Sequence, residues 1–217
     1  MSAIEAIQGI IADVSAVQQR LLRDVGRVES DPVIASAVVA DVAAEELTAR
    51  TALFGLGYVV APERHGSALM SWWQALGDAR EVRRLDAGAT GTGTVRSYEE
   101  LEWYAVPRRT GEPHMTGPYV DLLCTDQATL TFTTPLVVDG AFGGVVGADV
   151  TVRSFECAVA DALRAAGEGA LVVTDEGRVA ASTDPTVLVQ RRLAAGALDG
   201  YALERVPGAP LSVAVPR

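Results

Sequence analysis

The chain has 217 residues, of which 49% are hydrophobic, so it is long enough to bury one sizeable core. Its 28 acidic and 18 basic residues give a net charge of −10, which disfavours binding to nucleic acid or to anionic membranes. The apolar runs are shorter than the ~18 residues that a membrane span needs. We therefore expect a soluble globular chain without a membrane span.

The sequence gives little indication of the cellular compartment in which the protein is located. The N-terminus has no basic stretch leading into a continuous apolar segment, so we expect no export signal in the chain. Cys124 and Cys157 are too few for a disulfide framework and have no partners at metal-ligand spacing. We predict a cytoplasmic location, or an extracytoplasmic one if the sequence is a fragment of a receptor.

Two consecutive helices are predicted at the N-terminus. The first has an apolar stripe at alternating spacings of three and four, with Gln18 in its one polar position. The stripe consists of Ile4, Ile7, Ile11, Val14, Leu21, Val25 and Val28. Such a helix either packs on its own domain or forms a coiled-coil dimer, and Gln18 slightly favours the dimer because a polar core position can fix register. Ser30, Asp31 and Pro32 predict the start of a second helix, which should end near Thr51.

The middle of the chain is predicted to form an antiparallel sheet. Strands are expected at residues 54–60, 100–108, 128–139 and 142–152, which are rich in β-branched and aromatic side chains. Asp139 and Gly140 separate the last two strands at the spacing of a hairpin turn. Residues 68–76, around Trp72 and Trp73, are predicted to form a short helix.

The C-terminal part is predicted to contain a helix at residues 155–166 and then a second, smaller sheet. Its strands are expected at residues 170–174, 178–181, 201–206 and 211–215, with a further helix at 188–195. This order of elements favours the α+β class over an alternating βαβ fold. We divide the chain into N-terminal helices for dimerisation and signalling (1–53), a ligand-binding module (54–166) and a short second module (167–217).

Five short elements follow one another in the central region. They are the aromatic pair Trp103-Tyr104, the turn proline Pro107, the Pro-Tyr-x-Asp element at residues 118–121, the strand end Thr133-Thr134-Pro135 and the Gly-Val-x-Gly-x-Asp strand at residues 144–149. In this order they resemble the Cache family of PAS-like sensor domains, also called PDC domains. The resemblance implies a PAS-like antiparallel sheet packed by long N-terminal helices, a short second module, and a domain that binds a small molecule and catalyses no reaction.

The resemblance also suggests where a ligand binds. In amino-acid-binding members, an arginine two residues before the aromatic pair holds the ligand carboxylate, whereas tyrosine and aspartate hold the ammonium group. Leu101 stands at the position of that arginine, while Tyr119, Asp121 and Asp149 match the ammonium side. The resemblance therefore implies an amine-containing ligand without an anchored carboxylate. The alternative is a small carboxylate, held by Arg96 or by backbone amides.

Elementary electrostatics supports a cation near Asp149, because a carboxylate at the end of an apolar strand needs a partner to be buried. A cation over an aromatic face gains about 0.5 to 2 kcal/mol. The aromatic candidates for the walls of the site are Trp72, Trp73, Trp103, Tyr104 and Tyr119. Three alternatives remain: Trp72 and Trp73 belong to the core, Asp149 bonds to backbone amides, and Asp121 caps a turn.

No motif indicates catalysis or a metal site. His65 and His114 form no metal-binding pattern, and no nucleophile elbow is present. We therefore expect no catalytic residue, no metal and no cofactor. The expected partners are a small ligand, a second copy of the chain, and a signalling output that is either a separate protein or a missing domain. The rival interpretations are a dimerisation or interaction module that senses nothing, and a small-molecule enzyme whose site is assembled from residues distant in sequence.

Overall fold

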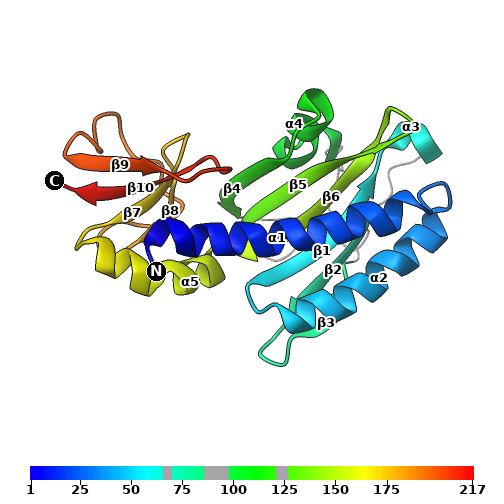
Figure 1. The fold of residues 1–217 in the computed structure, drawn as a ribbon, viewed down its shortest axis with the longest axis horizontal. Coiled ribbons are helices and arrows are strands. Elements are labelled where there is room, and N and C mark those ends of the chain that lie inside the picture. The colour runs from blue at the N-terminus through cyan, green and yellow to red at the C-terminus, as the bar shows by residue number, and fades with distance from the viewer. Residues whose placement is uncertain (66–69, 86–97, 121–126) are drawn as a thin grey trace, which may run out of the picture.

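The structure is a computed structural model that describes residues 1–65, 70–85, 98–120 and 127–217. Two antiparallel sheets of unequal size lie end to end, and the first helix, α1 (Ala3–Gly26), packs on the larger of them (Figure 1). Both termini lie at the end of the molecule that carries the smaller sheet (Figure 1). The predicted α+β class, with long N-terminal helices and a second small sheet, is confirmed.

The larger sheet has six strands. They are β1 (Leu53–Val60), β2 (Met70–Leu76), β3 (Glu81–Arg84), β4 (His114–Val120), β5 (Ala128–Val138) and β6 (Ala141–Thr151). Their order is β3-β2-β1-β6-β5-β4. The predicted hairpin between β5 and β6 is confirmed, and Asp139 and Gly140 at its turn both have positive φ.

Both predicted N-terminal helices are present, and the second begins where the sequence predicts. Ser2 and Glu5 form a capping box at the start of α1, and Asp31 caps α2 (Pro32–Ala49). The apolar stripe of α1 is buried against its own chain, which is the first of the two interpretations of that stripe. Gln18 is also buried there, so its position does not argue for a dimer.

Three predicted elements are wrong. Residues 100–108 form no strand, because α4 (Glu102–Thr110) buries Trp103, Tyr104 and Pro107 at a helical spacing. The described part of the predicted helix at 68–76 is strand β2, which pairs with a strand on each edge. Residues 188–195 form no helix, because the backbone of Gln190 and Arg191 pairs with Val179 instead.

The remaining elements complete both halves of the molecule. The short helices are α3 (Pro62–His65) and η1 (Tyr98–Glu100), and α5 (Val152–Ala166) leads to the smaller sheet. That sheet contains β7 (Leu171–Thr174), β8 (Val179–Ser182), β9 (Tyr201–Arg205) and β10 (Leu211–Pro216) in the order β8-β7-β10-β9. Among the described residues, no helix is both long enough and apolar enough to cross a membrane.

Candidate functional site

One face of the larger sheet collects polar side chains in a row across four strands. Gln74 of β2 lies opposite Gly55 of β1, Gly55 opposite Asp149 of β6, and Asp149 opposite Thr131 of β5. Side chains of directly paired residues lie on the same face of a sheet. Since Gly55 has no side chain, Oδ2 of Asp149 and Nε1 of Trp72 occupy the space above it. We call this face the Asp149 face.

Trp72 and Thr131 both donate hydrogen bonds to the Asp149 carboxylate. It is only 3% exposed. The indole Nε1 of Trp72 donates a hydrogen bond to Oδ2 at 3.1 Å, and the hydroxyl of Thr131 donates to Oδ1 at 2.7 Å. Backbone amides were the alternative partners expected for Asp149, whereas these two donors are side chains.

Tyr119 joins the same hydrogen-bonded chain. Its hydroxyl oxygen lies 2.9 Å from Oγ1 of Thr131. Because the single hydroxyl proton of Thr131 is donated to Asp149, Tyr119 must be the donor to Thr131. The structure therefore brings Tyr119 and Asp149, which are distant in sequence, into one network through Thr131.

Glycines make room for the indole of Trp72 on this face. A Cβ atom at Gly57 would lie 2.4 Å from Cε3 of Trp72, and one at Gly147 would lie 2.6 Å from Cη2. A Cβ atom at Gly55 would lie 2.7 Å from Oδ2 of Asp149. The indole therefore lies flat over bare backbone, in position to donate to Asp149.

The aromatic pair predicted from the sequence lies on α4, and this helix covers another part of the Asp149 face. Tyr104 is fully buried, and its ring centre lies 5.0 Å from that of Tyr98 and 5.6 Å from that of Phe142. Trp103 packs edge-on against Tyr104 with ring centres 6.0 Å apart. These rings and Trp72 belong to one apolar cluster, separate from the main core.

Among the described residues, three buried polar groups on the Asp149 face have no hydrogen-bond partner. They are Nε2 of Gln74, which is 3% exposed, the hydroxyl of Tyr104, and the hydroxyl of Thr116, which lies opposite Thr131. Burial, and then the neighbouring Tyr98, raise the pKa of the Tyr104 hydroxyl, so it remains a protonated donor. Buried groups of this kind are rare in folded proteins and indicate a missing partner.

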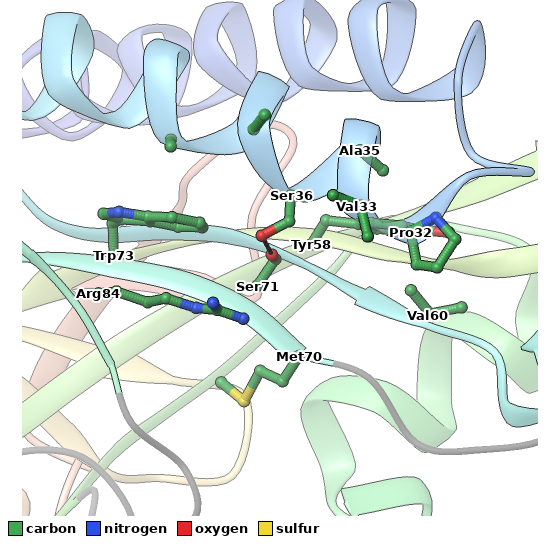
Figure 2. Close-up of a pocket in the computed structure, with 12 residues that line it drawn as sticks. Pro32, Val33, Ala35, Ser36, Tyr58, Val60, Met70, Ser71, Trp73 and Arg84 are labelled. Atoms are coloured by element: carbon green, nitrogen blue, oxygen red, sulfur yellow. Dashed lines mark hydrogen bonds between the residues drawn. The ribbon is translucent and has the colours of Figure 1, made fainter.

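The structure does not bring every predicted residue to this face. Successive side chains of a strand point to opposite faces, so Trp73 points away from Trp72 and lines a groove beneath α2 (Figure 2). Arg96 and Asp121 lie outside the described residues. Gln74 was missed, because it becomes visible as a site residue only once residues 70–76 are known to be a strand.

Comparison with known proteins decides the family. Residues 41–156, more than half of the chain, match the family described as methyl-accepting chemotaxis protein-like, first PDC sensor domain. The chain belongs to this PDC sensor family. The resemblance to Cache domains is therefore confirmed, and the molecule is a sensor domain of signal transduction. No curated protein matches the sequence.

Solved structures of sensory and extracellular domains share the whole fold at low sequence identity. A structure named methyl-accepting chemotaxis protein X is 16% identical, with a TM-score of 0.63, 99% of this chain covered and 96% of the other. The sensory domain of the Campylobacter jejuni chemoreceptor Tlp3 with isoleucine bound is 15% identical, with a TM-score of 0.64 and coverages of 99% and 87%. The extracellular domain mmHK1S-Z3, described as part of a histidine kinase, is 13% identical, with a TM-score of 0.68 and coverages of 99% and 89%.

Proposed function

We propose that this PDC domain senses a small polar ligand that carries an amine and binds on the Asp149 face. The observation that carries the proposal is the pair of buried, unpartnered polar groups of Gln74 and Tyr104, on the same face as the Asp149 carboxylate. The carboxylate suits an ammonium group, while the amide and the phenol suit hydrogen-bond acceptors of the ligand. A ligand with both kinds of group would satisfy all three.

The Asp149 carboxylate suits a charged ligand group. Trp72 and Thr131 orient the carboxylate without adding a positive charge. A hydrogen bond between an ammonium group and a carboxylate in a water-poor site is about twice as strong as a neutral one. Tyr119 and Trp72 add aromatic surface beside the carboxylate, which also favours a cation.

Structural relatives support an amino acid as the model ligand. The Campylobacter jejuni Tlp3 sensory domain has been solved with isoleucine and with L-valine bound. In this chain Leu101 replaces the arginine that the family uses for the ligand carboxylate, and Gln74 offers a neutral donor instead. Arg96 is the other candidate for that anchor.

A sensor of small carboxylates is the second candidate function. The same two donors, Gln74 and Tyr104, favour it, because a carboxylate without an amine would also satisfy them. This alternative predicts binding that does not depend on Asp149. The interaction-module alternative predicts no ligand at all.

Three analogues of one ligand separate these functions. L-Valine carries both groups, isobutylamine retains only the amine, and isovalerate retains only the carboxylate. A ligand at about 100 times its dissociation constant adds about 2.7 kcal/mol of stability, which a thermal-shift measurement resolves. We expect L-valine to bind, isobutylamine to bind more weakly, and isovalerate not to bind. Binding of isovalerate alone would establish the carboxylate sensor, and no shift with any of the three analogues would refute both sensor proposals.

Site variants test the placement of the amine. We expect Asp149→Asn to weaken amine binding at least tenfold in calorimetry, because it removes the charge while keeping the shape. Asp161→Asn is the matched control, since Asp161 is exposed on α5. Equal affinity in the two variants would remove Asp149 from the site. If Asp149→Asn does not fold, the three analogues on the unchanged protein still decide.

Signalling requires further partners, which we propose from the family. The extracellular relatives favour the extracytoplasmic alternative for this domain. The output would lie in a separate protein or in a further domain of a receptor. A homodimer remains our prediction, and its contacts would involve α2, where Ile34 is exposed.

A further inference from the structure

A groove on the opposite side of the large sheet is separate from the Asp149 face. It lies between the first half of α2 and strands β1 to β3, and its volume is about 460 Å³ (Figure 2). Ser71 and Trp73 of β2 point into it, whereas Trp72 between them points to the Asp149 face. A ligand in the groove therefore cannot contact Asp149.

The walls of the groove are largely apolar. The helix contributes small side chains, which leave space between α2 and the sheet: Ala35, Ser36, Ala37 and Ala40. Across from them, the strands contribute Tyr58, Val60, Met70 and Trp73. A volume of a few hundred cubic ångströms with mostly apolar walls and a few polar groups is typical of small-molecule sites.

One cation and one hydroxyl pair provide the polar groups. Arg84 lies directly opposite Trp73 on the neighbouring strand, and its guanidinium carbon is 5.6 Å from the centre of the Trp73 ring. Within the described residues, Arg84 has no carboxylate partner, whereas the adjacent Arg83 pairs with Glu81 at 2.7 Å. Ser71 donates a hydrogen bond to Ser36 across the groove at 2.6 Å (Figure 2).

We propose that this groove binds a small monocarboxylate with an apolar body. Arg84 is held in place by the ring of Trp73, so its planar fork is available for a carboxylate at little entropic cost. The apolar walls would cover the body of the ligand. No acidic side chain lines the groove among the described residues, so an amine has no counter-charge there. This ligand class and location are independent of the proposed amine site.

Titration calorimetry with octanoate, below its micelle-forming concentration, tests the proposal. Octylamine and 1-octanol serve as probes with the same body and a different head group. We expect octanoate to bind, and Arg84→Gln to weaken it about tenfold, as the loss of one charge-assisted hydrogen bond predicts. Arg84→Lys should retain more affinity than Arg84→Gln. Ala40→Leu should abolish binding by filling the groove.

Arg83→Gln is the matched control, because it removes the same charge from the same strand outside the groove. The proposal is overturned if octanoate does not bind, if 1-octanol binds as tightly as octanoate, or if Arg83→Gln and Arg84→Gln weaken binding equally. Asp149→Asn should leave octanoate binding unchanged. The failure of the amine site and the failure of the groove are therefore distinguishable.

Discussion

Trp72 and Trp73 are adjacent in sequence and lie in opposite environments. Trp72 is buried on the Asp149 face, and its N–H is bonded to a carboxylate. Trp73 is half-buried in the groove beneath α2, where its ring stacks with Arg84. The pair therefore allows one chemical change, tryptophan to phenylalanine, to be compared in two settings with the same loss of ring size.

We predict that Trp72→Phe destabilises the domain by about 2 kcal/mol or more, because a hydrogen bond to a charged group contributes about 1.5 to 3 kcal/mol. Trp73→Phe should cost less, since it loses about 0.5 to 1 kcal/mol of cation–π energy at a half-exposed position. Urea unfolding of both variants measures the difference. A larger loss in Trp73→Phe would contradict the assigned role of the Trp72–Asp149 contact.

For single residues, the sequence predicts which side chains can bind a ligand better than it predicts which of them lie together in the fold. Tyr119 and Asp149 were predicted on family resemblance, and Thr131 joins them in one hydrogen-bonded network. Thr131 was not predicted, because a threonine in a β-branched strand looks like any strand residue. Gln74 was missed for a different reason: its place beside Asp149 depends on the pairing of β2 with β1 and of β1 with β6, which is long-range information.

At the scale of elements, long periodic or well-capped segments were predictable, and short aromatic ones were not. Asp31 and Pro32 mark the start of α2 as expected. The aromatic residues of α4 suggested a strand, but the helix packs on three strands of the sheet, and Gly111 ends it in the left-handed conformation. Tertiary packing thus overrides local propensity in short elements.

Gln18 shows how α1 is attached to the large sheet. Its amide nitrogen donates to the carbonyl oxygen of Phe132 at 2.8 Å, and its oxygen accepts from the hydroxyl of Thr134 at 3.2 Å. Both contacts are buried inside one chain. The polar residue in the stripe therefore fixes where α1 sits on β5, which is the role that the sequence analysis gave to a register-setting residue between two chains.

We predict that Gln18→Leu lowers the free energy of unfolding by about 1 to 3 kcal/mol, because it leaves the two polar groups of β5 without their partner. The exposed neighbour Gln19 provides the control, and Gln19→Leu should change stability by less than about 0.5 kcal/mol. Urea unfolding measures both. Light scattering should give the same molar mass for Gln18→Leu as for the parent protein. A changed molar mass would mean that Gln18 lies in a dimer interface.

At the scale of the whole molecule, one hydrophobic core joins the two sheets. The same cluster contains Ile7 of α1, Val146 of the large sheet, Phe155 of α5 and Leu211 of the small sheet. Because α1 packs on the large sheet and on α5, and α5 packs on β8 of the small sheet, these helices connect the packing of the two sheets (Figure 1). The sequence suggested separate modules at 54–166 and 167–217, a division that remains a prediction for folding and for signalling.

The shared core leads us to predict that both sheets unfold in one cooperative transition. All three tryptophans belong to the first 166 residues, so their fluorescence reports on the larger part, whereas circular dichroism reports on both sheets. The two signals should give the same urea midpoint. Ile7→Ala, which opens a cavity in the shared core, should lower both midpoints together, by about 2 to 5 kcal/mol of unfolding free energy. Separate midpoints would mean that the second module unfolds by itself, and α1 would then be too weak a link to carry a ligand signal from one sheet to the other.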